Sequence, residues 1–403
     1  MASLIASAVI DMIADRRARQ RHDQWAREAA ADRIRLTSYR RPVAFGQPLD
    51  QNAADWYHQA FSRSIEPSPE QLTQLHALVD AGLGQEASLP HDLEAVCFEA
   101  NAARIAQALQ CTRCDWKLDY GMGASSLFDP NARAVAVADC LTLAGHRAAG
   151  AQRWDSAANA YLKVTAYGCD LGAGNLIMNI VGIGAAKTGL GALARLLTTV
   201  DYHPVLFRDV ANRLTGLQSC LPTLRNGIQL DRLQFTNAII VEALTANSRT
   251  SGWIHFLPRH ALTAWRLTRD LELVNGVAQG AAIADREERA RFISELQQRS
   301  TTSNPLVKEY LVASGLGAVD EANDLVRDAH AVLAVIEIEQ WHAREGRYPA
   351  GPSQVPSLLH EDRVRYERAA DGSGYSLFGT SVAGKPQTLA QRSRRDRPLS
   401  PVR

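Results

Sequence analysis

The chain has 403 residues, of which 46% are hydrophobic, 22% charged and 6% aromatic, and its length accommodates about two or three domains. This balance supports a packed globular interior and excludes a wholly disordered chain or a polytopic membrane protein. Lysine and arginine number 44 against 43 for aspartate and glutamate, so the net charge is +1. Because there is no basic excess, we expect no nucleic-acid partner.

Residues 1–66 are expected to form N-terminal helices. The first 13 residues are apolar but interrupted by Asp11, whereas a membrane-spanning helix needs about 20 apolar residues. They also lack the basic lead and the cleavage site of a signal peptide. We therefore expect a soluble chain, with membrane association only through an N-terminal anchor missing before Met1.

Helix start signals and apolar spacing predict a helical body over residues 67–317. Ser68 is a capping residue, Pro69 occupies the first helical position, and Gln71 completes a capping box. Apolar residues then recur at three- and four-residue spacing, which is typical of an amphipathic helix. The apolar face of this helix consists of Leu72, Leu75, Leu78 and Val79.

One stretch of the body resembles a single tetratricopeptide-like helix pair. It has an apolar helix over residues 137–144, glycines at Gly145 and Gly150 that would loosen the turn, and a second helix that opens at Trp154. No second copy follows at a fixed period. We therefore predict an irregular α-solenoid or helical bundle rather than a regular superhelix.

Residues 176–197 are the most apolar stretch and are rich in glycine. Its segment Gly182–Gly189 resembles a nucleotide-binding loop, but Ala186 stands where a phosphate loop needs glycine. Lys187 likewise stands where a dinucleotide fingerprint needs glycine. A central buried helix with tight helix contacts is favoured over both a cofactor site and a membrane span.

The C-terminal part changes character. A long helix is predicted from about Val319 to Gly346, and two short strands flank a glycine-rich turn at residues 371–374 as a β-hairpin. We assign residues 318–385 to this helix-plus-hairpin module and the polar, basic residues 386–403 to a disordered tail. The predicted fold class is mainly α, with a small C-terminal α+β module.

Residues 334–349, which end in Gly346-Arg347-Tyr348-Pro349, together with the hairpin resemble the soluble part of type II secretion pseudopilins. That family ends its long helix with Gly-x-Tyr-Pro and packs a small antiparallel sheet on it. Similar segments close uncharacterised helical envelope proteins of bacteria. The resemblance implies a periplasmic or inner-membrane-associated location, with the cytoplasm as the alternative. The pseudopilin calcium-loop carboxylates have no counterpart after Gly379, so assembly into a pilus-like fibre is not expected. The resemblance implies a module and not an activity.

Six cysteines, at positions 97, 111, 114, 140, 169 and 220, are too few for a disulfide scaffold in a chain this long. Cys111 and Cys114 are the only close pair. A structural zinc site needs a second such pair, and a thioredoxin-type motif follows a strand rather than a helix. A structural or incidental pair is favoured, with a local disulfide or a weak metal contact as the alternative.

Two further pairs of residues are candidates for a metal site or for an acid–base histidine. Glu339 and His342 have the spacing of di-iron carboxylate sites, but the chain has no second Glu-x-x-His. We predict that Glu339 is an exposed helix charge and that His342 is favoured by the helix C-terminal dipole. His255 and His260 flank a short apolar segment, for which a loop capped by a helix is the ordinary interpretation.

No catalytic, cofactor-binding or metal-ligating residue is therefore assigned. We expect a non-enzymatic protein-interaction or scaffold protein that has protein partners and belongs to the bacterial envelope or a secretion-type assembly. The alternative is an enzyme with a groove site in the helical body. For that enzyme the candidates are His255, His260, Glu339 and His342. A metal or cofactor carrier through Cys111 and Cys114 is the third hypothesis.

Overall fold

The computed structural model describes residues 39–64, 66–82, 99–117, 131–224, 316–359, 362–381 and 386–393, with Leu93 and parts of 12–31 and 227–299. The contacts divide the chain into two units. The first comprises residues 1–38, 117–128 and 224–319, and the second comprises residues 39–116, 129–223 and 320–403. The four segments predicted above stay a prediction.

The first unit is described in part and is helical. It contains α12, Arg286–Arg299. The indole of Trp25 donates a hydrogen bond to the carbonyl of Leu233 at 2.7 Å, which joins two parts of this unit that are 208 residues apart.

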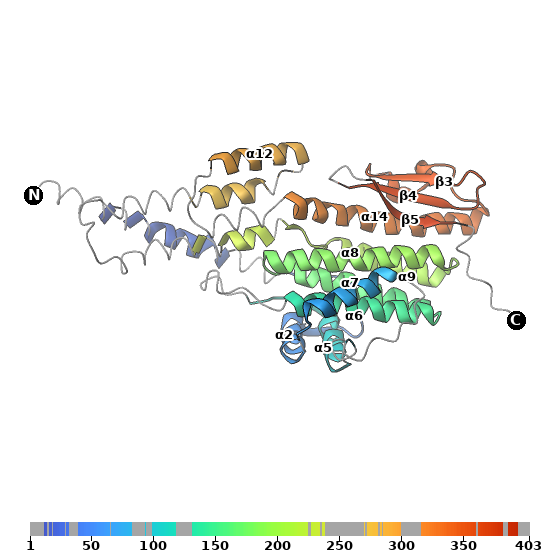
Figure 1. Ribbon diagram of the computed structural model, residues 1–403, viewed down its shortest axis with the longest axis horizontal. Coiled ribbons are helices and arrows are strands. Elements are labelled where there is room, and N and C mark those ends of the chain that lie inside the picture. Colours follow the sequence, from blue (N-terminus) through green and yellow to red (C-terminus); the bar gives the residue numbers. More distant parts are fainter. Residues whose placement is uncertain are drawn as a thin grey trace, which may run out of the picture. The chain divides into compact units, whose positions relative to one another are not determined.

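The second unit contains most of the described residues, and its helices confirm the predicted mainly α class. Figure 1 shows α6, α7 and α8 side by side, and the C-terminal sheet lies with α14 next to α8. Its helices are α2 (Ala53–Arg63), α3 (Pro69–Ala81), α5 (Glu99–Gln110), α6 (Asn131–Gly150), α7 (Trp154–Gly172), α8 (Leu176–Thr199), α9 (Pro204–Gln218) and α14 (Leu316–Glu345).

The start of α3 confirms the capping signals read from the sequence. The Ser68 side chain accepts a hydrogen bond from the Gln71 amide at 3.2 Å, and the Gln71 side chain accepts one from the Ser68 amide at 2.9 Å. Leu75 and Val79 are buried against residues of α6, including Leu143. The predicted apolar face therefore attaches α3 to the helical body.

Glycines bring the backbones of α7 and α8 into close contact, and the segment Gly182–Gly189 lies within α8 and not in a loop. A Cβ atom on Gly182 would lie 2.6 Å from the carbonyl oxygen of Gly168, and one on Gly189 would lie 2.8 Å from that of Tyr161. By length and composition α8 could cross a membrane, but 61% of its most apolar window is buried inside the protein. Helix packing accounts for these glycines.

The expectation that Gly145 loosens a turn is wrong. Gly145 lies within α6, where the ring of Tyr161 occupies the space that a Cβ would need. The chain turns later, at Gln152, whose φ of 57° is in the left-handed region. Gly145 is thus required by the close approach of α7, and α6 continues to Gly150.

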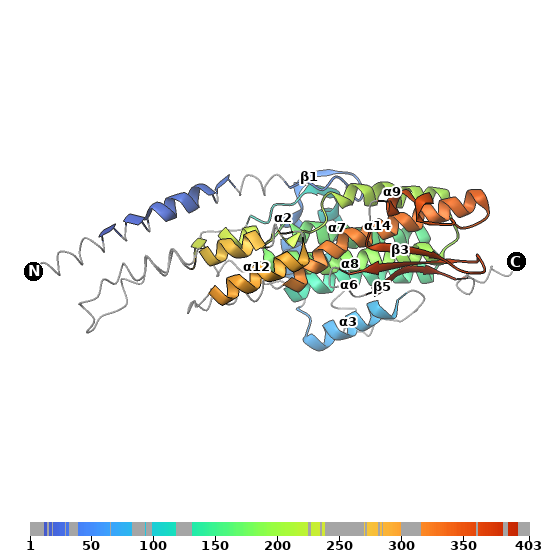
Figure 2. The ribbon, with the colours of Figure 1, turned by 90° about the horizontal axis from the view of Figure 1, so that it is seen from above.

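The described strands form two small sheets. Strands β1 (Leu49–Asn52) and β2 (Cys111–Arg113) pair in parallel. At the C-terminus, the antiparallel sheet has the order β3-β4-β5, and Figure 2 shows it beside α14. Its strands are β3 (Val364–Arg368), β4 (Tyr375–Thr380) and β5 (Pro386–Arg392).

The predicted hairpin is confirmed as β3 and β4, but the predicted disordered tail from residue 386 is wrong in its first part. Residues 386–392 form β5, which pairs with β4 along its length. The polar composition of β5 does not indicate a strand, because a strand at the edge of a sheet leaves most of its side chains in solvent. Only Ala390 of β5 is buried. Pairing with β4, and not apolar alternation, specifies this strand.

Two neighbouring glycines of α8 provide a matched test of the α7–α8 contact. Gly182→Ala is expected to lower the free energy of unfolding by about 1–3 kcal/mol, because the added methyl group forces the two backbones apart. Gly184 has nothing within 4 Å of an added Cβ. Gly184→Ala should therefore be neutral or stabilise by up to about 1 kcal/mol. Urea unfolding measures both, and equal effects would contradict the close contact.

Candidate functional site

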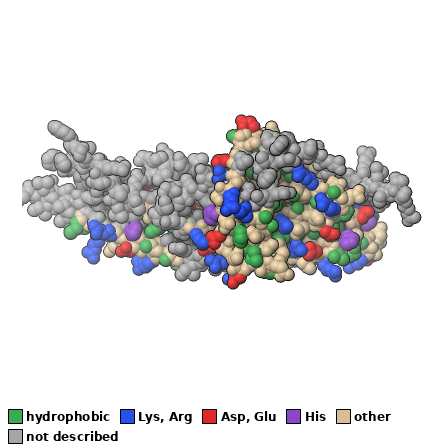
Figure 3. Space-filling view, turned by 90° about the horizontal axis from the view of Figure 1, so that it is seen from below, with side chains coloured by type: hydrophobic (Ala, Val, Ile, Leu, Met, Phe, Trp, Pro, Cys, Tyr) green, Lys and Arg blue, Asp and Glu red, His purple; other side chains and the backbone are tan. Residues whose placement is uncertain are grey.

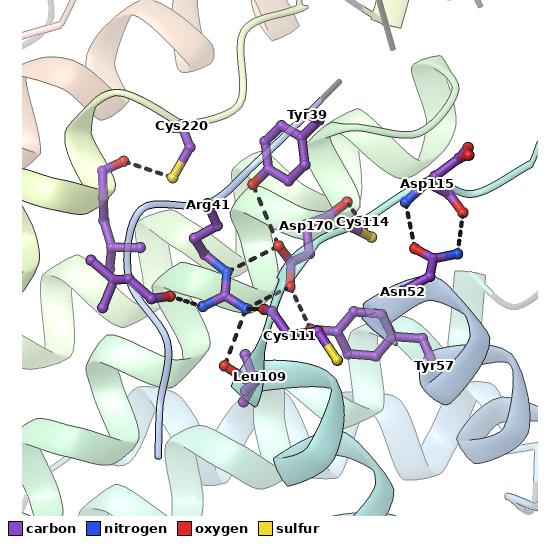
Figure 4. A network of polar contacts seen from close by, with 12 residues as sticks. Tyr39, Arg41, Asn52, Tyr57, Leu109, Cys111, Cys114, Asp115, Asp170 and Cys220 are labelled. Carbon is purple, nitrogen blue, oxygen red and sulfur yellow. Dashed lines mark hydrogen bonds and ion pairs between the residues drawn. The ribbon is translucent and has the colours of Figure 1, made fainter. Parts of the chain in front are cut away.

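A buried ion pair lies at the centre of the second unit. Asp170 belongs to the last turns of α7, and Arg41 precedes β1 (Figure 4). The guanidinium Nε of Arg41 lies 3.1 Å from the carboxylate Oδ1 of Asp170, and the two side chains are 0% and 1% exposed. Two charges this deeply buried must satisfy each other and their remaining hydrogen-bonding capacity.

Arg41 uses its other donors on three backbone segments. Its Nη1 donates to the carbonyl of Val43, and its Nη2 donates to the carbonyls of Leu109 at 3.2 Å and Cys111 at 2.7 Å. One guanidinium thus connects the segment before β1, the end of α5, the start of β2 and the carboxylate on α7.

Asp170 is surrounded by aromatic donors. The hydroxyl of Tyr57 donates to its Oδ2 at 2.8 Å, that of Tyr39 donates to its Oδ1 at 3.4 Å, and the indole of Trp116 donates to its backbone carbonyl at 2.8 Å. Burial raises the pKa of Asp170, while Arg41 and the tyrosine hydroxyls lower it. With these partners, Asp170 joins the end of α7 to Tyr39, to Tyr57 on α2 and to Trp116 after β2.

The cysteine pair predicted from the sequence belongs to the same region. Cys111 and Cys114 are free, buried thiols, so the alternative of a local disulfide does not hold in this structure. Their thiols donate to the carbonyls of Gln107 at 3.4 Å and Asp170 at 3.8 Å, respectively. Within the described residues, no group of three or more His, Cys, Asp or Glu side chains could hold a metal ion. Cys140 is disulfide-bonded.

A second ionic cluster lies in the C-terminal module, by which we mean α14, the connection that follows it and β3–β5. Glu339 is 1% exposed, so the prediction of an exposed charge is wrong. Its Oε2 lies 3.0 Å from Nη1 of Arg392 on β5, which also donates to the carbonyl of Val200 at 2.9 Å. Nη2 of Arg392 lies 3.2 Å from Asp201. Glu339 is buried because the third strand, missed in the sequence, folds over it.

The environment of Glu339 opposes its charge. Burial raises its pKa to about 7, against the lowering effect of Arg392 and of the Tyr375 hydroxyl. That hydroxyl faces the carboxyl, yet it and the Glu339 Oε1 atom are both buried without a hydrogen bond of ordinary geometry. Burial therefore favours the neutral carboxyl, and the ion pair with Arg392 favours the charged one.

The motif Gly346-Arg347-Tyr348-Pro349 forms the corner between α14 and the sheet. Gly346 has a φ of 68°, which reverses the chain after the last helical turn. The ring of Tyr348 stacks on His342 at 4.2 Å and lies 5.2 Å from that of Tyr375 on β4. The hydroxyl of Tyr366 donates to the carbonyl of Pro349 at 2.8 Å. Tyr348 and Pro349 of the motif thus connect α14 to the sheet.

Arg327 provides a second tie between α14 and the sheet. Its buried guanidinium lies 3.2 Å from Asp324 and 2.5 Å from Asp328, and it donates to the side chain of Gln387 on β5 at 3.2 Å. Asp324 also pairs with Arg363 at 3.3 Å. Ion pairs at two heights on α14 therefore hold the same sheet.

The candidates from the sequence do not assemble into one site. Glu339 pairs with Arg392, whereas His342, in the last turn of α14 as predicted, stacks on Tyr348. His255 and His260 lie outside the described residues. The hypothesis that these two histidines belong to a site therefore stays a prediction.

One histidine–carboxylate contact was missed in the sequence. His76 on α3 is 63% exposed, and its Nδ1 lies 2.8 Å from Oδ2 of the buried Asp139 on α6. Burial raises the pKa of Asp139 to about 6, against the lowering effect of His76. The two residues are 63 positions apart, so no local spacing could have indicated the pair.

No family model matches this chain, and no curated protein and no solved structure matches it either.

The raised pKa of Glu339 makes stability depend on pH. Since the folded state holds this proton more tightly than the unfolded chain, whose ordinary value is 4.5, stability is lost as pH rises from 4.5 through about 7. The shift corresponds to about 3 kcal/mol. In the wild type, the free energy of unfolding should fall between pH 4 and pH 8, as measured with urea. We expect this fall to be smaller in Glu339→Gln, by about the same amount.

A control variant separates this effect from the other carboxyl groups. Glu337→Gln removes another carboxylate from the same helix. The Glu337 carboxylate accepts hydrogen bonds from Ser357 and not from Arg392. It should retain the wild-type pH dependence. If Glu339→Gln also retained it, the assignment to Glu339 would be wrong.

Proposed function

We propose that this chain is a non-enzymatic protein-interaction or scaffold protein of the bacterial cell envelope, in which a helical body presents the C-terminal module to a protein partner. The observation that carries the proposal is the corner at residues 346–349. Its glycine turns the chain, and its tyrosine packs between helix and sheet. This supports the resemblance to the soluble part of pseudopilins, which pack a small antiparallel sheet on a long helix through the same motif.

The uses of the buried polar side chains support a role without catalysis. Asp170 and Arg41 satisfy each other and the surrounding backbone, and Glu339 is bound to Arg392 on the sheet. Catalytic groups usually face a pocket in which a substrate can reach them. These groups instead join helices and strands, so a structural role explains their burial.

The surface charge and the disulfide support the proposed partner and compartment. On the face in Figure 3, basic and acidic side chains of the described residues are interspersed, without a field of one sign. Such a surface suits a protein partner better than a nucleic acid. The disulfide of Cys140 is a bond that persists in oxidising compartments such as the periplasm.

The alternative, an enzyme with a site in the helical body, is favoured by one observation. A buried carboxylate that accepts from an exposed imidazole can orient it as an acid or base, and Asp139 holds His76 in this way. The hydrogen bonds described for His76 end at Asp139. The pair also joins α3 to α6, which accounts for it without chemistry.

Site-specific photo-crosslinking in the native host tests the interaction. A photoreactive phenylalanine analogue replaces Leu359, which lies in the connection between α14 and the sheet and is 55% exposed. Because the module is the proposed contact surface, we expect a discrete adduct of higher mass that contains a second protein, detected on denaturing gels and identified by mass spectrometry.

Val205, on the helical body, is the matched control. It is 59% exposed and apolar, like Leu359, but lies on α9 outside the module. The proposal predicts no discrete adduct from this position. Adducts of equal yield from both positions, or none from Leu359, would contradict it.

A further inference from the structure

Strand β3 forms an edge of the C-terminal sheet. In the order β3-β4-β5, β5 lies against α8 (Figure 1), and β3 is the strand at the opposite edge. Within the described residues, β3 pairs only with β4. The outer side of an edge strand carries a row of backbone donors and acceptors, which is a template for pairing with another chain. A further strand could therefore join the sheet at β3.

Two hydrogen bonds at the ends of β3 show which of its backbone groups face β4. The amide of Thr380 donates to the carbonyl of Arg363 at 2.8 Å, and the amide of Ala369 donates to the carbonyl of Gly374 at 2.9 Å. In an antiparallel pair, both backbone groups of a residue face the same neighbouring strand, and successive residues alternate. Since the register between β3 and β4 has no shift, every odd-numbered residue of β3 faces β4.

The even-numbered residues of β3 therefore direct their backbone groups outward. These residues are Val364, Tyr366 and Arg368. In the part of the chain that the structure describes, their amides and carbonyls have no hydrogen-bond partner. The free edge thus presents three residues whose donors and acceptors are in the right alternation for another antiparallel strand.

The charged side chains of β3 match a second copy of the same strand. Arg365 and Glu367 lie on the solvent face, 71% and 50% exposed, and form an ion pair at 3.0 Å within one chain. Suppose that two β3 strands pair in antiparallel fashion with Tyr366 opposite Tyr366. Arg365 of each copy then lies opposite Glu367 of the other copy. Opposite charges in directly opposed positions stabilise a pair of strands.

The same charges disfavour the neighbouring registers. The outward backbone groups of two such strands meet only if the register changes in steps of two residues. One step places Arg365 opposite Arg365, and one step in the other direction places Glu367 opposite Glu367. Like charges in opposed positions are destabilising. The alternating charges therefore select the arrangement that is centred on Tyr366.

We propose that β3 is a self-association surface, at which a second copy of this chain pairs in antiparallel fashion about Tyr366 to form a symmetric dimer. Such a dimer uses the same residues of both copies. The contact is short, with five residues from each strand, and small interfaces give weak association. The dimer should therefore dissociate on dilution. The inference does not depend on the proposed envelope partner, because both strands belong to this chain.

Sedimentation velocity of the purified full chain at a series of concentrations tests the proposal. We expect a reversible equilibrium between monomer and dimer. Arg365→Glu and Glu367→Arg should each weaken the dimer at least about tenfold, because each places like charges opposite one another at both symmetric positions. The double variant R365E/E367R restores opposite charges, so its dimerisation constant should return to within about threefold of the wild-type value.

Arg208→Glu is the matched control. Arg208 is an exposed arginine on α9, outside the C-terminal module. Its substitution makes the same change in charge as Arg365→Glu but leaves β3 intact. It should therefore leave the equilibrium between monomer and dimer unchanged.

Hydrogen exchange, resolved for single residues, tests whether β3 is the contact. The amides of Val364, Tyr366 and Arg368 should exchange at least about tenfold more slowly in the dimer than in dilute protein, because pairing gives them acceptors. The amides of Arg365 and Glu367 already face β4. They should be protected at both concentrations and provide an internal reference.

Three results would overturn the proposal. A chain that stays monomeric at every concentration would mean that the charges of β3 protect the edge against pairing. A dimer in which the outward amides still exchange quickly would have its contact elsewhere. Failure of R365E/E367R to restore a dimer that the single variants weaken would contradict the register. Since the wild-type measurements need no substitution, the test stands even if a variant folds poorly.

Discussion

The ion pair between Arg41 and Asp170 is the contact on which the helical body depends. Removing two charges from water is unfavourable by several kcal/mol for each ion. In this protein the unfavourable term is offset by a 3.1 Å contact and by hydrogen bonds to three backbone carbonyls and two tyrosine hydroxyls. Loss of either partner would leave a buried charge, so the elements that meet there are held as one.

Helix α7 connects this ion pair to the neighbouring helix α8. Within three residues it provides Gly168, which lets α8 approach, and Asp170, which binds Arg41. A side chain at Gly168 would collide with the backbone of α8. Shifting α7 by a fraction of an ångström would therefore disturb the helix contact and the ion pair together.

The C-terminal module repeats the same design on a smaller scale. Arg392 on the last strand binds Glu339 on α14 and the carbonyl of Val200 beyond α8, so one residue joins the sheet to two helices. The corner at residues 346–349 contacts the same end of the sheet, because its Tyr348 packs on Tyr375, the β4 residue that pairs with Arg392. If the proposed function is correct, this double attachment presents the sheet to a partner in one orientation.

The sequence could predict those structural features that depend on residues adjacent in the chain. The capping box at Ser68, the helix stop at Gly346 and the hairpin of β3 and β4 each arise from a few adjacent side chains, and each is confirmed. The packing use of Gly182 also followed, because the alternative motif required specific residues that are not present.

What the sequence could not predict are contacts between distant residues. Arg41 and Asp170 are 129 positions apart, and neither has a neighbour that reveals the pairing. The burial of Glu339 depends on β5, whose polar residues resemble a tail because a sheet edge tolerates them. A lone charge on a helix is most often exposed, so the expectation for Glu339 failed where tertiary structure overrides the local pattern.

A double-mutant cycle on Arg41 and Asp170 tests most directly whether this pair is the structural centre. We predict that Arg41→Met and Asp170→Asn each lower the free energy of unfolding in urea by about 3–5 kcal/mol. The double variant should lose clearly less than the sum, because the second substitution removes the unpaired partner. The partly exposed pair Arg213–Asp209, with side chains 33% and 53% exposed, provides the comparison, with a coupling of at most about 1 kcal/mol. Additive losses, or single variants as stable as the wild type, would contradict the account.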